Sequence, residues 1–473
     1  MEWETVIGLE VHVQLATVTK MFCACRTSYG EPPNTVVCPT CLGLPGALPA
    51  ANLEAVRLGV LGARALGCTV HQTSVFARKN YFYPDLPKGY QISQFDKPLA
   101  TDGAILVETP ERGTIRVGIT RLHLEEDAGK SLHDRIPGQT AIDLNRAGTP
   151  LAEIVGFHDL RSPAEARAYL TTLRQLLVYA GVSECSMEKG SLRVDANLSV
   201  RRPGAPLGTK TEVKNMNSFA NVERALESER TRQIALLEGG ESVEQVTLTF
   251  NAATGAVKVL RVKEDAHDYR YFPDPDLPPM VLESAWLEAR DAELPELPTA
   301  RQGRFRDAFG LPDYDVGVLT AEPVVADYVE AIVTAGAEPK VAANWVMGEA
   351  MARFKETGTF AVTPDRLAAL ITLQGSGFLS GNAAKEVFRE MVEDTEADPK
   401  AIAIRLGVVQ VQDAGALEGW VDEVLAAHPG EVERYKGGDA KLIGFFVGQV
   451  MKRSRGKADP KGIQPILAAR LDR

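Results

Sequence analysis

The sequence predicts an α+β protein, in which a large, mostly antiparallel β-sheet domain at residues 1–293 precedes two helical domains, residues 294–406 and 407–473. From residue 5 to about residue 290, apolar and polar residues alternate between Gly, Pro, Asn and Asp turns, which is typical of strands. At Leu294–Pro298 the pattern changes, and helical periodicity dominates the rest of the chain. A second break lies near Gly407–Gly415, and a length of 473 residues suits about three domains.

Individual elements follow from the same patterns. Ser162-Pro163-Ala164-Glu165 has the residues of an N-cap, a first-turn proline and a capping box, so a helix begins there. Residues 79–94 combine aromatic residues with prolines and show no periodicity, which predicts an irregular functional loop. We expect strands at 6–15, 115–124, 141–145, 150–157, 192–201 and 209–214, and helices at 52–66, 162–179, 221–238, 321–335, 340–356, 364–374 and 383–393, with about three more near the end.

Composition limits the possible classes of protein. The chain is 45% hydrophobic and 24% charged, and no apolar run approaches the ~18 residues that a membrane span needs. The start is acidic, unlike a signal peptide, and six cysteines in so long a chain suit a reducing compartment. We therefore expect a cytoplasmic protein with no membrane partner. A net charge of -11 argues against general coating of nucleic acid.

The C-terminal end nevertheless carries a local basic cluster. Its members are Lys452, Arg453, Arg455, Lys457 and Lys461, with Phe445 and Phe446 upstream. Such a cluster suits contact with an RNA backbone, and the alternative is a solvated helix face.

Several predicted strands carry charged residues on one face only. In the strand that leads to Asp127, the residues Arg121, His123, Glu125 and Asp127 share a face, together with Ile119. The other strand faces of this kind contain Glu10 and His12; Asp143 and Asn145; Arg193, Asp195 and Asn197; and Lys210, Glu212 and Lys214. We expect one sheet with a packed face and a concave charged face.

This mixture of charges suits a metal-bound polyphosphate, because carboxylates hold a hard cation while Lys and Arg bind phosphate oxygens. The alternative is a solvated face with cross-strand ion pairs. Glu153 lies within the apolar run 151–155, where a buried carboxylate needs a cation or strong donors; an exposed position would need neither.

Common catalytic motifs are missing from the sequence. Gly129-Lys130-Ser131 resembles the end of a Walker A motif, but Leu124 occupies the position of its first glycine. No G-x-G-x-x-G, H-E-x-x-H or G-x-S-x-G motif occurs, and no cysteine has an evident catalytic partner. Any ATP site would therefore be built on the sheet.

Two cysteine pairs, Cys23-x-Cys25 and Cys38-x2-Cys41, have spacings that could close a tetrahedral zinc site. The first spacer is shorter than usual, and free structural thiols are the alternative. Cys68 and Cys185 have no such neighbours and are expected to be buried singly.

Five long motifs resemble those of the GatB family, the B subunits of bacterial glutamine-dependent aspartyl/glutamyl-tRNA amidotransferases. They lie, in order, at residues 79–94, 123–130, 143–150, 208–215 and 263–273, and the likeness extends over essentially the whole chain. The resemblance implies a cradle domain with the active site, then a helical domain, then a small YqeY-like helical tail domain that binds tRNA.

The resemblance also implies a carbon–nitrogen ligase reaction. ATP phosphorylates the side-chain carboxylate of Glu on tRNA(Gln) or of Asp on tRNA(Asn), and ammonia then displaces the phosphate to leave the amide. The ammonia comes from glutamine hydrolysed by an amidase subunit (GatA), and a small clamp subunit (GatC) completes a heterotrimer. Contact with the cognate aminoacyl-tRNA synthetase is left open. The absence of a hydrolytic nucleophile motif agrees with this division of labour.

By similarity, Mg²⁺ is assigned to Glu10, His12 and Glu125, with Glu126 and Glu153 as further catalytic candidates. Histidine is an unusual Mg²⁺ ligand, so His12 would act through a water or favour Mn²⁺. Some family members bind zinc through cysteines that match the two cysteine pairs. Lys79, Arg193, Lys210 and Lys214 are phosphate-clamp candidates chosen from polarity alone, and Lys452, Arg453, Arg455 and Lys457 are candidate tRNA contacts.

Two other functions compete with this interpretation. One is a non-catalytic tRNA-docking subunit of an RNA-modifying complex, and the other is a metal-dependent hydrolase. Docking of phosphates alone would gain nothing from carboxylates such as Glu10, Glu125 and Asp195, so the sequence favours the enzyme.

Overall fold

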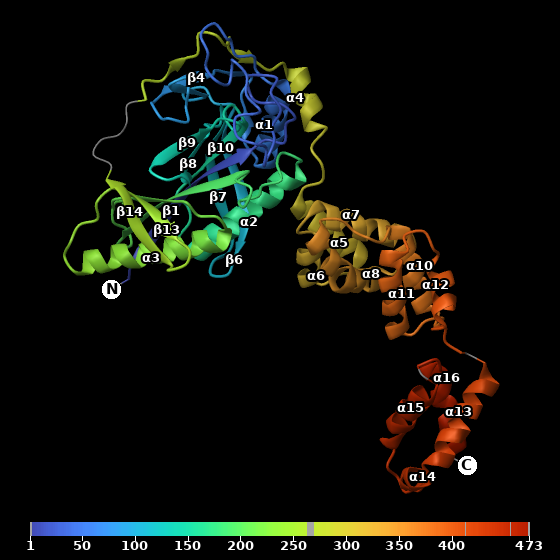
Figure 1. Ribbon diagram of the computed structural model, residues 1–473. Coiled ribbons are helices and arrows are strands. Elements are labelled where there is room, and N and C mark those ends of the chain that lie inside the picture. Colours follow the sequence, from blue (N-terminus) through green and yellow to red (C-terminus); the bar gives the residue numbers. More distant parts are fainter. Residues whose placement is uncertain (1, 263–268, 412, 455, 472–473) are drawn as a thin grey trace. The chain divides into compact units, whose positions relative to one another are not determined.

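The computed structural model describes residues 2–262, 269–411, 413–454 and 456–471. The chain forms two compact units, Met1–Pro298 and Thr299–Arg473. The first is built on a large β-sheet and the second is helical, which confirms the predicted α+β class (Figure 1). Within the described residues, no helix is both long and apolar enough to cross a membrane.

The large sheet has the strand order β14-β13-β12-β11-β1-β10-β7-β6-β2. All neighbouring strands in it are antiparallel except β12 and β13, as expected for a mostly antiparallel sheet. Its members are β1 Glu4–Gln14, β2 Thr69–Val70, β6 Ala100–Thr109, β7 Gly113–Glu126, β10 Pro150–Gly156, β11 Leu192–Arg201, β12 Thr211–Lys214, β13 Val246–Asn251 and β14 Ala256–Val262.

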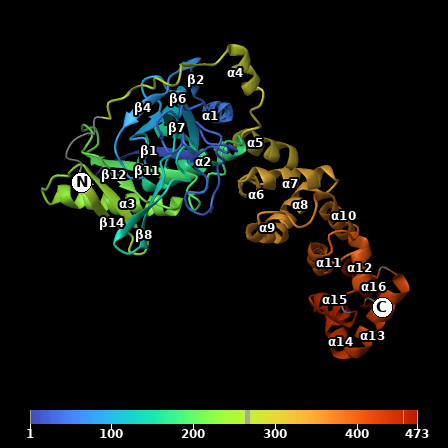
Figure 2. The same ribbon diagram turned by 45° about the horizontal axis from the view of Figure 1, so that its top comes forward.

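Three helices cover one face of this sheet: α1 Leu53–Ala65, α2 Pro163–Tyr179 and α3 Phe219–Glu238 (Figures 1 and 2). Their apolar side chains join those of the strands, such as Leu9 and Leu124, in one hydrophobic core. Helix α4, Ser284–Asp291, packs against α1. Ser162 caps α2 by accepting from the Glu165 N–H, and Pro163 is in the first turn, as the sequence predicts. The opposite face of the sheet, which these three helices do not cover, carries the charged residues.

A β-bulge corrects one detail of the sequence analysis. Between β10 and β7 the register shifts, so that Val155 opposes Arg121 while Gly156 opposes Ile119. The extra residue Thr120 turns Ile119 to the packed face, where its side chain is completely buried. The prediction that Ile119 shares the face of Arg121 is therefore wrong. Strict alternation cannot reveal an inserted residue.

Three small sheets lie beside the large one: β4 Ala77–Asn80, β5 Tyr90–Ser93 and β15 Phe272–Pro273; β3 Thr73–Ser74 with β16 Met280–Val281; and β8 Lys130–Ile136 with β9 Gln139–Asp143. The segment predicted to be an irregular loop, 79–94, is thus the tip and return strand of a β4–β5 hairpin.

The strand expected at 141–145 does not join the large sheet, which corrects the predicted polar face of Asp143 and Asn145. These side chains instead accept hydrogen bonds from the backbone of Asn34 and Val36, 3.2 and 2.8 Å long. They therefore fasten the β8–β9 hairpin to the cysteine-containing segment.

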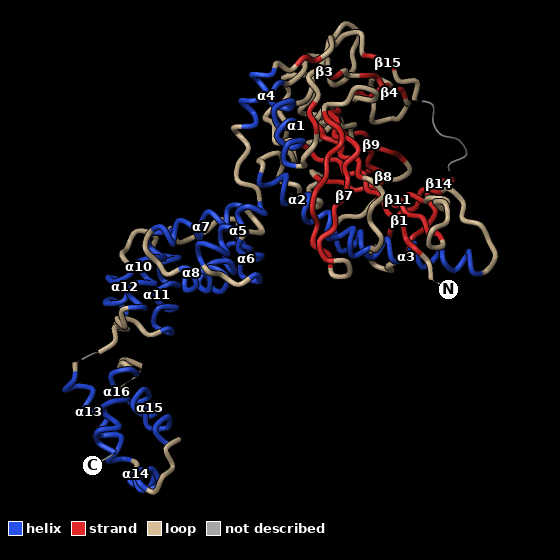
Figure 3. The backbone as a smooth tube through the Cα atoms, turned by 180° about the vertical axis from the view of Figure 1, so that it is seen from behind, coloured by secondary structure: helices blue, strands red, loops and turns tan. Residues whose placement is uncertain are grey.

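Within the described residues of the second unit, all regular structure is helical (Figure 3). Its helices form two separate cores, one around Phe305 and Val329 and one around Phe446 and Leu467. The helix expected at 340–356 is interrupted by a π-helical turn, Val346–Ala350. The other elements are α5 Pro298–Phe309, α6 Asp313–Leu319, α7 Pro323–Thr334, α8 Pro339–Trp345, α9 Met351–Thr357, α10 Pro364–Gly375, α11 Gly381–Glu393, α12 Pro399–Leu406, α13 Ala414–Ala427, α14 Pro429–Lys436, α15 Leu442–Arg453 and α16 Pro460–Leu471.

The three-domain division at 293/294 and 406/407 stays a prediction. The two separate hydrophobic cores of the second unit support its later boundary.

Candidate functional site

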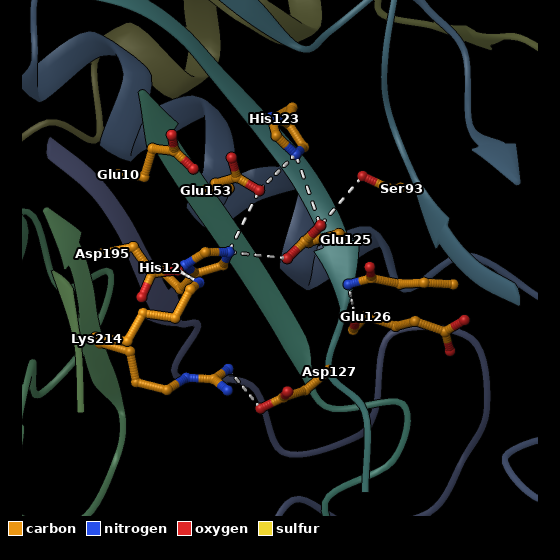
Figure 4. A network of polar contacts seen from close by, with 12 residues as sticks. Glu10, His12, Ser93, His123, Glu125, Glu126, Asp127, Glu153, Asp195 and Lys214 are labelled. Atoms are coloured by element: carbon orange, nitrogen blue, oxygen red, sulfur yellow. Dashed lines mark hydrogen bonds and ion pairs between the residues drawn. The ribbon is translucent and has the colours of Figure 1, made fainter. Parts of the chain in front are cut away.

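Side chains from three neighbouring strands meet on the charged face of the sheet: His12 of β1, Glu125 of β7 and Glu153 of β10. His12 Nε2 lies 3.5 Å from Glu125 Oε1 and 3.3 Å from Glu153 Oε2 (Figure 4). One ligand atom from each of the three residues lies within 4.8 Å of the others. This spacing can hold a metal ion.

Strand register brings these residues together. His12 is directly opposite Glu153 on one side and Arg193 on the other, and Glu153 is in turn opposite His123. Directly paired residues on antiparallel strands point to the same face, so the four side chains form a row across the sheet. Glu125 lies two residues after His123 and joins from the next row.

His123 is a fourth member of the cluster, to which sequence reasoning gave no role. Its ring is buried, and Nε2 lies 3.3 Å from Glu153 Oε2 and 3.7 Å from Glu125 Oε2. Its Nδ1 is buried without a hydrogen-bond partner in the described part of the chain. Ser93, from β5, donates to Glu125 Oε2 over 3.1 Å. The sequence did carry one indication of this position: strand alternation places His123 on the same face as Glu125.

The two imidazoles and two carboxylates hold each other in their charged forms. Burial disfavours the imidazolium of His123, but Glu153 and Glu125 outweigh it and raise its pKa to about 9. His12 shows the same balance, and its pKa is also raised. Burial alone would raise the pKa of Glu153, yet His123 and His12 hold that pKa well below its usual value. The carboxylates are thus ionised and ready for a cation.

Glu10 is also a predicted Mg²⁺ ligand. It lies beside His12, Glu125 and Glu153 but does not belong to that close group. Its carboxylate accepts a hydrogen bond of 3.1 Å from Asn197. Burial and then the charges of Glu153 and Asp195 raise its pKa. Glu10 lines the same cleft as the cluster, one row away from His12.

Glu126 lies on the other side of β7, and Figure 4 shows its side chain directed away from His12. Its carboxylate accepts from the Ile92 N–H over 3.0 Å and pairs with Lys88. It is buried but does not line the cleft. Its contacts indicate that it fastens β5 to β7.

Around the cluster lies a polar cleft of about 640 Å³, whose lining includes three of the four predicted phosphate clamps, Lys79, Arg193 and Lys214. Lys79 Nζ lies 4.9 Å from the centre of the Tyr269 ring, and although burial opposes its charge, Glu125 raises its pKa. Arg193 donates to Asp127 over 2.7 Å. Cations and carboxylates therefore share one cleft.

The fourth predicted phosphate clamp, Lys210, and the predicted tRNA contacts do not line this cleft. Lys210 is exposed just before β12 and lines a smaller neighbouring hollow. Lys452 and Arg453 end α15, where Arg453 forms an ion pair of 2.7 Å with Glu423. Lys457 is exposed, and Arg455 lies outside the described residues.

The four predicted zinc cysteines, Cys23, Cys25, Cys38 and Cys41, also come together, with sulfur atoms within 4.8 Å of one another. The Sγ atoms of Cys38 and Cys41 are 3.8 Å apart, and a tetrahedron with Zn–S bonds of about 2.3 Å has edges of about 3.8 Å. A hydrogen bond from Cys23 is the main cause that lowers the pKa of Cys41, to about 4. The group therefore fits a four-thiolate metal site.

Lys20 supports this cysteine site. Its side chain is completely buried, and Nζ lies 3.6 Å from Cys41 Sγ while donating to the Val36 carbonyl over 2.9 Å. A buried ammonium needs an anionic partner, and a thiolate supplies one.

Comparison with known proteins identifies the family. A profile described as "GatB/GatE catalytic domain" matches residues 5–288, and one described as "GatB domain" matches residues 327–471. The chain belongs to the GatB family. Proteins named as the B subunit of aspartyl/glutamyl-tRNA(Asn/Gln) amidotransferase, from Moorella thermoacetica, Geobacter sulfurreducens and Chlorobaculum tepidum, are 52%, 50% and 49% identical to it. Each match covers 100% of both chains, which confirms the resemblance noted from the motifs.

We predict that His123 gives the metal-free protein a specific pH dependence. Its pKa is raised from 6.5 to about 9, so its imidazolium stabilises the fold fully below pH 6.5, and this stabilisation is lost as the pH rises through 9. The amount is on the order of 3 kcal/mol. Urea unfolding in chelator at about pH 6 and about pH 10 should show this loss in the wild type and a smaller one in His123→Gln, in which His12 still titrates. An exposed-histidine control, His133→Gln, should behave as wild type, and an unchanged profile for His123→Gln would contradict the prediction.

Proposed function

We propose that this chain is the subunit that amidates misacylated tRNA, in an ATP-dependent, glutamine-dependent amidotransferase. Its substrates would be Glu-tRNA(Gln), Asp-tRNA(Asn) or both. The observation that carries the proposal is the cleft in which His12, Glu125 and Glu153 adjoin Lys79, Arg193 and Lys214. Its position within the matched catalytic-domain residues 5–288 supports it.

The chemistry explains why such a cleft is needed. A carboxylate does not react with ammonia because oxide is a poor leaving group. Transfer of the γ-phosphoryl group of ATP to a carboxylate oxygen gives an acyl phosphate and ADP. Ammonia then forms the C–N bond, phosphate leaves with the C–O electron pair, and a proton is released. The protein positions the reactants and stabilises the charge that develops on the phosphoryl oxygens.

Glu125, Glu153 and, once its imidazolium proton is released, His12 would hold a divalent cation, Mg²⁺ or Mn²⁺, with His123 and Ser93 orienting the carboxylates. Such a cation, when bound, neutralises charge on the polyphosphate. Lys79 and Arg193, which line the same cleft, would contact phosphoryl oxygens. Glu10 is one row away and would complete the ligand set only through a water.

The proposed enzyme also requires partner subunits and binds tRNA as its substrate. The relatives' names describe one lettered subunit of an amidotransferase, which supports membership in a multi-subunit enzyme. We assign glutamine hydrolysis to an amidase subunit (GatA) and the clamp role to a small subunit (GatC), in the cytoplasm where charged tRNA is used. Lys452, Arg453 and Lys457 at the tail would contact the RNA backbone.

A non-catalytic tRNA-docking subunit is the alternative function. It is not favoured, because docking leaves no use for two buried, ionised carboxylates that share a cleft with two histidines.

We predict that Glu125→Gln lowers the rate of amide formation at least ~100-fold, because the cation loses a charged ligand. The assembled complex would be tested with ATP, glutamine and each misacylated tRNA, and tRNA affinity should stay within about twofold. Glu111→Gln, an exposed glutamate outside the cleft, is the matched control. Equal loss of tRNA binding and amidation in Glu125→Gln would mean that the residue is structural.

For the four cysteines, we predict one zinc ion per chain, which Cys38→Ala removes. Metal analysis of the purified protein measures this, and the same variant should melt at a lower temperature because bound zinc stabilises the fold. Cys68→Ala is the control, since Cys68 is buried far from the other thiols in sequence and is not in their cluster. Zinc-free wild type, or equal zinc loss in both variants, would contradict the assignment.

At the tail, removal of residues from 407 onward should weaken tRNA affinity and flatten its dependence on salt, because fewer cations displace counterions from RNA. The double substitution of Lys452 and Lys457 by alanine should do the same to a smaller extent. Two exposed lysines elsewhere in the second unit, Lys355 and Lys400, provide the control pair. An unchanged binding isotherm for the truncated chain would exclude a tRNA role for this segment.

A further inference from the structure

Strand β7 loses its neighbour on one side just before it reaches the cleft. The pairing of β6 with β7 ends with Ala100 opposite Leu122, because β6 begins at Ala100. The following residues of β7, His123–Glu126, have no β6 residue opposite them in the described pairing, although their other side is paired with β10. This open stretch contains Glu125, on which the proposed cation site depends.

An open strand edge exposes backbone groups that need hydrogen-bond partners. In an antiparallel pair, alternate residues direct their N–H and C=O groups to the same neighbouring strand. The Asp127 N–H donates to the Thr149 carbonyl beside β10, so Leu124 and Glu126 present their backbone groups to the side that β6 has left. Both residues are buried, and a buried backbone group without a partner is costly.

Two buried glutamines, Gln91 of β5 and Gln94 just after it, occupy this open edge. Gln94 Oε1 accepts a hydrogen bond of 3.0 Å from the Leu124 N–H, and Gln91 Nε2 donates one of 2.8 Å to the Glu126 carbonyl. Gln94 Oε1 also accepts from the N–H of Leu99, the last residue before β6. The two side-chain amides thus take the place of a strand backbone where β6 is missing.

Strand β5 and its surroundings hold these glutamines in place. Gln94 Nε2 donates to the hydroxyl of Ser74, a completely buried residue of β3, over 3.1 Å. Gln91 lies within β5, which is paired with β4 along its whole length. Between them, Ser93 donates to Glu125 Oε2 over 3.1 Å (Figure 4). The β5 segment therefore binds the residue before Glu125, the residue after it and its carboxylate.

We propose that Gln91 and Gln94 are positioning residues that determine where the Glu125 carboxylate lies in the cleft. They fix the backbone on both sides of Glu125, and a site of this kind works only while its ligands keep their geometry. The assignment rests on the proposed function, in which Glu125 is a ligand of the divalent cation. Loss of an outer partner of a metal ligand typically costs about 10–100-fold in metal affinity or activity.

Two other roles compete with positioning. The first is stabilisation of the fold alone, and the location argues against it, because the two bonds are made to the residues that flank Glu125. The second is direct contact with a substrate, since both glutamines line the cleft. Against this, both polar atoms of the Gln94 amide already bind groups of the protein.

Gln91→Met and Gln94→Met test the assignment, because methionine keeps the length of the side chain and removes its hydrogen bonds. Mn²⁺ would be titrated into the assembled complex by calorimetry, and the signal that Glu125→Gln abolishes marks the site. Each methionine variant should raise the Kd for Mn²⁺ by at least ~10-fold and lower kcat for amidation to a similar extent. The KM for misacylated tRNA should stay within about twofold of the wild type.

A third buried glutamine provides the matched control. Gln233 of α3 donates to the Leu198 carbonyl of β11 over 3.2 Å, on the packed side of the sheet. Gln233→Met should therefore lower the melting temperature and leave the Kd for Mn²⁺ unchanged. Gln94→Glu should restore Mn²⁺ binding to within about threefold of the wild type, because carboxyl oxygens accept from both N–H groups. If a methionine variant does not assemble, Gln91→Asn and Gln94→Asn, which withdraw the amide by one methylene, take its place.

Three outcomes would contradict a part of this interpretation. A lower melting temperature with wild-type Mn²⁺ affinity and kcat in both methionine variants would overturn the positioning role, because it would show stabilisation alone. A raised KM for ATP or tRNA with unchanged Mn²⁺ affinity would overturn it in favour of direct substrate contact. A wild-type complex that binds no Mn²⁺ or forms no amide would instead refute the proposed function, and the remaining measurement would still decide the role of the glutamines.

Discussion

Charge pairing across three strands is the interaction on which the site depends. Glu153 stands between His12 and His123, each 3.3 Å from the same carboxylate oxygen. Buried carboxylates are costly unless cations meet them, and here two imidazolium rings do so. The packed face beneath, with Leu124 and Ile154 completely buried, fixes the strands at the spacing that this pairing requires.

The segments around the sheet hold this arrangement through a few buried contacts. Lys88 packs against Gly43 of the cysteine segment and pairs with Glu126. Glu126 also accepts from the Ile92 N–H, and Ser93, the next residue, donates to Glu125. A chain of contacts therefore runs from the cysteine segment through β5 to a carboxylate of the cleft. The cysteine segment and Glu125 are thus linked by direct side-chain and backbone contacts.

One strand, β1, borders three hollows on the charged face of the sheet. Its residues Gly8, His12 and Gln14 each face a different space on the same side of the sheet. Because β1 lies at the centre of the nine-stranded sheet and pairs with a strand on each side, the separations of these hollows are set by the sheet itself.

Local pattern in the sequence determined the central strands, the Ser162 cap, the charged faces that hold His12, Glu125 and Glu153, and the grouping of the four cysteines. These features depend on residue spacing, which the chain displays directly. Only the tertiary structure decided which residues of neighbouring strands lie opposite each other, because register depends on contacts between strands that are distant in the sequence. It placed Glu126 behind β7, Glu10 beside the cluster and Lys210 at another hollow, and it turned Ile119 inward through a bulge. It also gave His123 its place, since a buried imidazole between two carboxylates exists only once β7 and β10 have paired.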